Sequence, residues 1–251
     1  MRDRPSTPAA SSDAPAVYAM RAGGWRDYIT LLHPPYTAWH LSYVALGWAA
    51  APAAHGDRLA ALLIAFFLAV GIGAHALDEL NGRPLRTRIP SPLLVALAVV
   101  SIGLACGIGV AGAARTSWWL LTFVAFGGFI VCAYNLEWFE GVVHTNTWFA
   151  LAWGAFPAVT GSYANALRLR PEGILVAVGC FALSHAQRTL STPVRDLRRR
   201  TARVQGTMVS TGGAVRVLDA AALRAAPEGA LRWLALAVPL LAAAAVVARF
   251  G

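Results

Sequence analysis

The chain has 251 residues, of which 57% are hydrophobic and only 13% are charged, and its mean hydropathy is +0.56. Soluble domains average about 25% charged residues. A water-soluble globule of this size cannot bury so much apolar surface in one core. The composition therefore excludes an ordinary soluble enzyme, a disordered chain and a secreted disulfide scaffold, and it indicates an integral membrane protein.

The charge is strongly basic and comes from one residue type. All 21 basic residues are Arg, against 12 acidic residues, which gives a net charge of +9. No motif for reading RNA or DNA accompanies this charge, so we expect no nucleic-acid partner. In a membrane protein, excess Arg is better explained as cytoplasmic loop charge that faces anionic lipid.

The N-terminal region is the least apolar part of the chain. Residues 1–24 are expected to form a disordered cytoplasmic tail, because they are rich in Pro, Ala and Ser and contain no secretory signal. The segment 25–32 is amphipathic and is predicted to lie on the membrane surface. Residues 25–251 as a whole are predicted to form one transmembrane domain.

Apolar runs follow one another along the rest of the chain. They occupy residues 36–54, 59–77, 91–113, 117–134, 147–163, 173–187 and 233–250. The stretch 212–228 carries four charged residues, so it predicts either an interfacial helix or an eighth span. The expected fold is an all-α, polytopic bundle of seven to nine transmembrane helices. Most Arg residues fall on one side, which predicts a multi-pass protein of the bacterial inner membrane with a cytoplasmic N-terminus.

The first polar loop, residues 73–91, suggests a metal site. His75, Asp78 and Glu79 have the i, i+3, i+4 spacing that places side chains on one helical face. Two carboxylates at a helix C-terminus oppose the helix dipole, and a bound Mg²⁺ would relieve that conflict. The alternative is a solvated helix end with a surface ion pair between Glu79 and Arg83.

The second polar loop, residues 185–207, is rich in Arg and hydroxyl side chains and contains Asp196. Arg suits bidentate binding of phosphate, although the loop is equally explained as an anchor for lipid headgroups. A smaller polar cluster occupies residues 134–146. Together, an acidic loop and an Arg-rich loop on one membrane face suit a diphosphate held by Mg²⁺ and guanidinium groups.

Several short segments of the chain resemble motifs of the UbiA-type intramembrane prenyltransferase superfamily. They are 30–37 (TLLHPPYT), 88–91 (RIPS), 134–135 (YN), 156–161 (FPAVTG), and Asp196 through the trailing Gly206-Thr207. The family's first Asp-rich motif corresponds here to His75, Asp78, Glu79 and Asn81, with two carboxylates in place of three. Its second motif retains only Asp196, and the chain is shorter than is usual in the family.

The resemblance implies helices around a central cavity and a Mg²⁺-dependent transfer of an isoprenyl group from an isoprenyl diphosphate to an acceptor. We expect Asp78, Glu79 and Asp196 to hold Mg²⁺ and to be catalytic. Diphosphate contacts are expected from Arg86, Arg88, Arg195, Arg199, Asn81 and Tyr134. The sequence does not identify the acceptor, for which an aromatic compound and a lipid are the candidates, and membrane lipid is expected as a further partner.

Two alternatives share this site. A terpene cyclase on the same fold would ionise the same diphosphate and close the cation on its own double bonds. A catalytically degenerate homologue would act as a lipid-binding membrane protein. In either enzyme, aromatic residues such as Trp118, Trp119, Trp148, Trp153 and Tyr163 are candidates to line the cavity and stabilise a cation, or they are plain lipid anchors.

The charge bias predicts that both polar loops lie on the cytoplasmic side. Single cysteines placed at Asn81 and at Arg198, in a background without Cys106, Cys132 and Cys180, should react with a membrane-impermeant maleimide from the same side. Labelling from opposite sides of the membrane would rule out a site formed by the two loops.

Overall fold

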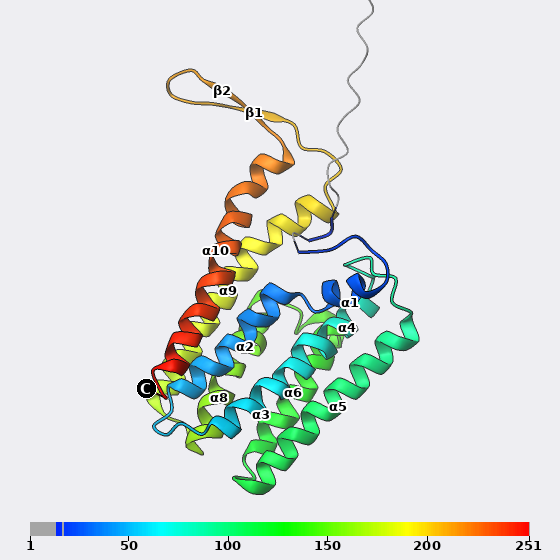
Figure 1. Cartoon of the computed structure of the whole chain (residues 1–251). Helices are drawn as coiled ribbons and strands as arrows, with labels where there is room; N and C mark the ends of the chain where they lie inside the picture. The colour runs from blue at the N-terminus through cyan, green and yellow to red at the C-terminus, as the bar shows by residue number, and fades with distance from the viewer. Residues whose placement is uncertain (1–13, 17, 251) are drawn as a thin grey trace, which may run out of the picture.

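The structure is a computed structural model that describes residues 14–16 and 18–250. These residues form a helical bundle from which one two-stranded hairpin projects (Figure 1). The α-helices are α1 (Trp25–Leu31), α2 (Pro34–Ala49), α3 (Gly56–Phe66), α4 (His75–Leu80), α5 (Ser91–Arg115), α6 (Leu120–Asn135), α7 (Asn146–Phe149), α8 (Phe156–Ala166), α9 (Pro171–Arg199) and α10 (Ala220–Val247). The other elements are the π-helical segments η1 (Phe67–Ala74) and η3 (Ala150–Ala155), the 3₁₀ turn η2 (Phe139–Gly141), and strands β1 (Gly206–Val209) and β2 (Val215–Leu218).

Two of the long helices in the bundle, here called rods, are each built from three consecutive helical elements. The segment η1 joins α3 to α4 into one continuous helix, and η3 joins α7 to α8 in the same way. With these junctions counted, each of the seven apolar runs overlaps one continuous helix for most of its length, although the runs 36–54, 117–134 and 233–250 extend beyond α2, α6 and α10. The described part of the chain is thus mostly helical, in agreement with the predicted class.

The stretch 212–228 differs from both of its predicted forms. Its first residues belong to the β1–β2 hairpin, in which Val209 pairs with Val215, and its last residues begin α10. The apolar residues Val215 and Val217 alternate with the charged Arg216, and this two-residue period is typical of a β-strand. Asp219 then caps α10, because its Oδ1 accepts a hydrogen bond from the backbone N–H of Ala222 at 2.7 Å.

Within the described residues, three helical rods are long and apolar enough to cross a membrane, namely Gly56–Leu80, Ser91–Arg115 and Ala220–Val247. Large apolar side chains on α5 and α10 face outward, including Val99, Leu104, Leu240 and Leu241. Outward-facing apolar residues are what a lipid environment favours. The structure therefore supports association with a membrane.

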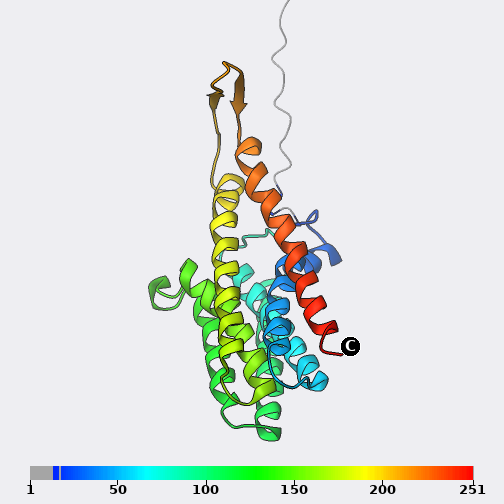
Figure 2. The same ribbon diagram turned by 90° about the vertical axis from the view of Figure 1, so that its left-hand side faces the viewer.

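Helix α2 lies at the centre of the bundle and packs against α8, α9 and α10 (Figures 1 and 2). Its Trp39, Tyr43 and Trp48 side chains are completely buried. The η3 segment also packs closely on α9. A Cβ atom on Gly154 would lie 2.6 Å from the carbonyl oxygen of Cys180, so only glycine allows this approach.

Residues 14–16 and 18–24, which belong to the predicted disordered tail, make defined contacts in the structure. The backbone N–H of Met20 donates to Thr30 Oγ1, and that of Gly23 donates to Asp27 Oδ1. Asp27 Oδ2 also accepts from the backbone N–H of Arg88 at 2.9 Å. This carboxylate thus joins α1 to the loop that follows α4. The first 13 residues of the predicted tail lie outside the described residues.

The loop between α4 and α5 is organised by Glu79. This side chain is fully buried, and its carboxylate accepts hydrogen bonds from the backbone N–H groups of Leu85 and Thr87 and from Thr87 Oγ1, all at 2.8–2.9 Å. The alternative surface pair with Arg83 does not form, because Arg83 donates instead to the Ile89 carbonyl and to Ser91 Oγ. The carboxylate predicted to bind metal is therefore occupied by its own loop.

Replacing Glu79 by Ala should destabilise the fold by about 3 kcal/mol, because two buried backbone N–H groups lose a charged acceptor. The melting temperature of the purified protein in detergent would measure this loss. The matched control is Arg88→Ala, since that side chain is exposed in the same loop and its removal should have little effect. Equal melting temperatures for the two variants would contradict this role of Glu79.

Candidate functional site

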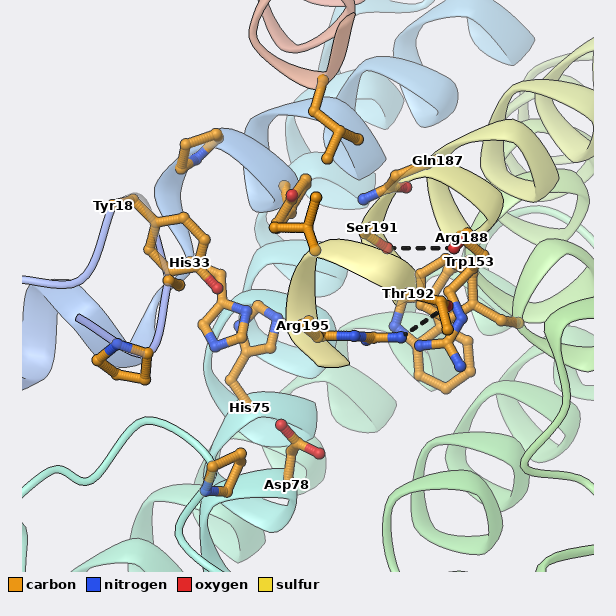
Figure 3. A pocket seen from close by; sticks show the side chains of 18 of the residues that line it. Tyr18, His33, His75, Asp78, Trp153, Gln187, Arg188, Ser191, Thr192 and Arg195 are labelled. Atoms are coloured by element: carbon orange, nitrogen blue, oxygen red, sulfur yellow. Dashed lines mark hydrogen bonds between the residues drawn. The ribbon is translucent and has the colours of Figure 1, made fainter. Parts of the chain in front are cut away.

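A cavity of about 900 Å³ lies at the end of the bundle where the first polar loop meets the C-terminal half of α9. Residues 185–199, which were predicted to belong to a second polar loop, are helical and form this part of α9. Elements far apart in the sequence build the cavity: the N-terminal segment, α2, the junction of η1 with α4, the end of α6, η3, α9 and α10 (Figures 1 and 3). Its polar lining residues include Tyr18, His33, Tyr36, His40, His75, Asp78, Asn81, Tyr134, Asn135, Glu137, His144, Gln187, Arg188, Ser191, Thr192, Arg195, Asp196, Arg198, Arg199, Arg200, Glu228 and Arg232.

The cavity wall is strongly cationic. Helix α9 contributes four Arg residues, Arg200 follows its last residue, and α10 contributes Arg232. Two of the guanidinium groups are oriented by neighbours, because Arg188 Nε donates to Asn146 Oδ1 at 3.0 Å and Arg195 Nη2 donates to Thr192 Oγ1 at 3.1 Å. Figure 3 shows Arg195 extending across the pocket from α9. So many guanidinium groups in one concave site favour a polyanionic ligand.

The four carboxylates of the cavity differ in their partners. Glu137 is exposed and lies 3.9 Å from His144 Nδ1. Glu228 is nearly buried and forms an ion pair with Arg198 at 2.7 Å, with Arg224 and Arg232 near it at 3.5 and 4.0 Å. Asp196 is half-exposed and lies 3.5 Å from Arg200. The Asp78 side chain forms no hydrogen bond or ion pair within the described residues, and it points toward the pocket (Figure 3). Asp78 is therefore the carboxylate most available to a ligand.

Two imidazole rings lie above Asp78. His33 and His75 stack with ring centroids 4.0 Å apart (Figure 3). His75 is fixed by a 3.1 Å hydrogen bond between its Nδ1 and the Gly71 carbonyl. His33 ends the turn before α2 with a φ of 46°, a left-handed conformation that is uncommon outside glycine. Burial lowers the pKa of His33 well below its usual range, so this ring is neutral at physiological pH.

The opposite wall is aromatic. Tyr134 stacks on His144 with ring centroids 4.4 Å apart, and it lies 4.5 Å from Trp153, which in turn stacks on Phe149. His40 Nδ1 lies 2.9 Å from the Trp153 carbonyl and joins this wall to α2.

Three polar atoms of lining residues are buried without a partner among the described residues: His33 Nε2, Tyr134 Oη and Gln187 Oε1. Buried polar groups normally make hydrogen bonds. Three buried polar atoms in one cavity that lack a partner in the described part of the chain therefore indicate a site for a ligand or for water.

The N-terminal segment covers part of the cavity. Arg198 Nη1 donates to the Ala14 carbonyl at 3.3 Å, and Arg199 Nε donates to the Pro15 carbonyl at 3.1 Å. The Tyr18 ring packs against His33, at a centroid distance of 5.1 Å, and meets Tyr36 edge-on. An anion that uses these donors of Arg198 and Arg199 competes with the two carbonyl groups.

The structure brings together most of the residues predicted for the site. Asp78, Asn81, Tyr134, Arg195, Asp196 and Arg199 all line the cavity. Arg86 and Arg88 do not, since their side chains are exposed on the far part of the loop. Glu79 is also outside the lining, because its carboxylate faces the amides of its own loop. Glu79, Arg86 and Arg88 were predicted to belong to the site because they lie close to Asp78 in the sequence. The chain reverses direction in this loop, so these side chains do not reach the cavity.

The metal-binding potential of the site is limited to two carboxylates. Among the described residues, no group of three or more His, Cys, Asp or Glu side chains is placed to hold a metal ion. Asp78 and Asp196 line the same cavity, however, and Mg²⁺ is commonly held by one or two carboxylates together with substrate phosphates and water. This donor set fits a Mg²⁺ that arrives with a diphosphate better than a metal held by protein alone.

Some lining residues were not predicted from the sequence. Tyr18 lies in a segment of low hydropathy that gave no structural signal. Glu228 and Arg232 come from the charged part of α10, where the pairing of Glu228 with Arg224 and Arg232 at i, i±4 was the available indication. Arg188 and Arg198 stand in the predicted Arg-rich loop beside the two Arg residues that were selected.

No family model, curated protein or solved structure matches this chain. The resemblance to the UbiA-type superfamily therefore depends on the short sequence segments alone.

Replacing Arg195 or Arg199 by Ala should weaken binding of inorganic pyrophosphate. Loss of a charge-assisted contact costs about 1.5–3 kcal/mol, which corresponds to about a tenfold to hundredfold rise in Kd. Isothermal titration of the purified protein would measure it. Arg86→Ala is the control, because that exposed side chain lies outside the cavity. Unchanged affinity in both cavity variants would assign these residues to lipid-headgroup anchoring.

Proposed function

We propose that the chain is a membrane prenyltransferase of the UbiA type, which transfers an isoprenyl group from an isoprenyl diphosphate to an acceptor. The observation that carries this proposal is the cavity itself, with six Arg side chains and two available carboxylates beside an aromatic wall at one end of an apolar bundle. An amphiphile with a polyanionic head and an apolar tail matches that combination. The short sequence segments support the same ligand class.

The proposed reaction assigns separate tasks to the residues of the cavity. The bond between C1 of the allylic chain and the bridging oxygen breaks, and its electron pair leaves with the diphosphate. Arg195, Arg199 and their neighbours on α9 stabilise the negative charge that develops on the leaving group. The acceptor then forms a bond to C1 and loses a proton. A bound Mg²⁺, held by Asp78 and Asp196, would supply further charge neutralisation at the diphosphate.

The aromatic wall suits the other half of the reaction. Tyr134, Phe149 and Trp153 present ring faces and edges within the same cavity. A ring face stabilises a cation by about 0.5–2 kcal/mol, and more where water is excluded. The Leu231, Ala235 and Leu236 side chains continue the cavity along α10 and offer an apolar path for the chain of the substrate.

A second candidate is a lipid-binding protein without catalytic activity. It is favoured by the burial of Glu79 in its loop, which leaves only two carboxylates where the family pattern has more. A terpene cyclase remains the enzymatic alternative on the same site. All three bind an isoprenyl diphosphate or a related anionic lipid, and they differ in whether diphosphate is released and whether release needs an acceptor.

Incubation of the purified protein with a panel of isoprenyl diphosphates and Mg²⁺ distinguishes these functions through released diphosphate. A transferase should release it when an acceptor is present, whereas a cyclase should release it without an acceptor and form a cyclic hydrocarbon. Binding without release under all conditions would favour the lipid-binding protein.

Asp78→Asn and Asp196→Asn keep the side-chain volume and remove the charge, so each should lower Mg²⁺-dependent turnover by about 100-fold. The double variant should lose little more, because residues that act as one unit are not additive. Asp57→Asn, at the opposite end of the rod that carries Asp78, is the matched control and should retain turnover. Full activity in either cavity variant would contradict the proposed roles.

A further inference from the structure

A second cavity, of about 550 Å³, lies on the other side of Trp153. It is enclosed by the α3–η1 rod, α5, α6 and the η3–α8 rod, and Trp153 lines both cavities. Its walls are mainly aliphatic and aromatic side chains, with Ala and Gly at many positions. Because Ala and Gly have small side chains, they leave an apolar channel open between the helices.

The second cavity extends from one end of the bundle to about its middle. On the α3–η1 rod it runs from Asp57 to Val70, fourteen residues that rise about 20 Å along the helix. Half the hydrocarbon core of a bilayer is about 15 Å thick. Trp118 and Trp119, which are highly exposed, follow α5 at the same end and mark a membrane–water interface. The cavity therefore has the depth of one lipid leaflet, the leaflet opposite the Arg-rich cavity.

The outer end of this cavity carries the charges. Arg58 and Arg115 line it there, together with one acidic residue, Asp57. Arg58 uses Nη1 to donate to the carbonyl groups of Ala164 and Asn165, and its other N–H groups make no hydrogen bond within the described residues. Arg115 is exposed at the end of α5. Guanidinium groups at the interface and a chain-sized apolar space below them complement a phospholipid.

We propose that this second cavity binds one acyl chain of a membrane phospholipid, with the lipid phosphate on Arg58 and Arg115. The proposal does not rest on the proposed prenyl transfer, because it concerns the other leaflet and different residues. The chain occupies the space between α3, α5, α6 and α8, and Trp153 closes the inner end. A lipid bound there fills the space that remains among these helices.

Two glycines of α5 provide a matched pair of variants. Gly112 lines the second cavity and a Cβ atom there would meet no atom within 4 Å, so a larger side chain would fill cavity space. Gly107 is equally free of neighbours but does not line the cavity. Both substitutions replace a helical glycine by the same residue, so their effects on helix propensity are alike.

The test uses phosphatidylglycerol with a photoactivatable diazirine on one acyl chain, added to the full chain in nanodiscs. After irradiation, mass spectrometry should find the probe on residues of α5 and α6 that line the cavity. Gly112→Leu should reduce this labelling by about tenfold, because the side chain takes the place of the acyl chain, whereas Gly107→Leu should leave it unchanged. Arg115→Gln, at an exposed position that tolerates substitution, should also reduce labelling.

Two further probes identify the ligand. A diacylglycerol with the same diazirine chain lacks the phosphate and should label the cavity less than phosphatidylglycerol. Equal labelling of the Gly112→Leu and Gly107→Leu variants, or no effect of Arg115→Gln, would overturn the proposal. So would labelling of these residues by a diazirine isoprenyl diphosphate but not by phosphatidylglycerol, since the cavity would then belong to the ligand of the Arg-rich site. Diphosphate release is also measured for Gly112→Leu. This second measurement distinguishes failure of the lipid proposal from failure of the proposed transferase function.

Discussion

The burial of one carboxylate fixes the geometry on which the Arg-rich cavity depends. Glu79 has no access to solvent, and its two oxygens accept three hydrogen bonds from the loop that leads into α5. A buried charge is costly unless it is fully hydrogen-bonded, so the loop is held in the one conformation that satisfies it. With Glu79 turned toward the loop, the adjacent Asp78 faces the cavity instead.

The π-helical segments position the other side of the site. A π turn inserts an extra residue into a helix and rotates the residues that follow, which is why such turns are frequent at functional sites. The η1 segment ends immediately before His75 and Asp78, and η3 contains Trp153. Trp153 then separates two cavities of different chemistry, one cationic and one apolar. The two cavities lie toward opposite ends of the bundle.

Charge in this protein is concentrated where a membrane protein can hold it at least cost. Charges are expensive in the apolar interior of a bilayer, so they gather at the ends of helices or inside polar cavities. Five Arg residues of the first cavity lie on the last turns of α9 or just beyond them. Their mutual repulsion is offset by Glu228, which reaches them from α10, and by the backbone carbonyls of the N-terminal segment.

The sequence by itself determined the mostly helical class of the fold, the approximate positions of the main helices and six of the residues that share the cavity, because hydropathy and local spacing depend only on neighbours along the chain. It could not determine that Glu79 faces its own loop, that Arg86 and Arg88 lie outside the cavity, or that residues 206–218 form a hairpin. Those outcomes depend on contacts between segments far apart in the sequence. Tyr18, Glu228 and the second cavity are likewise products of packing, since only the meeting of separate helices brings the side chains together and leaves the space between them.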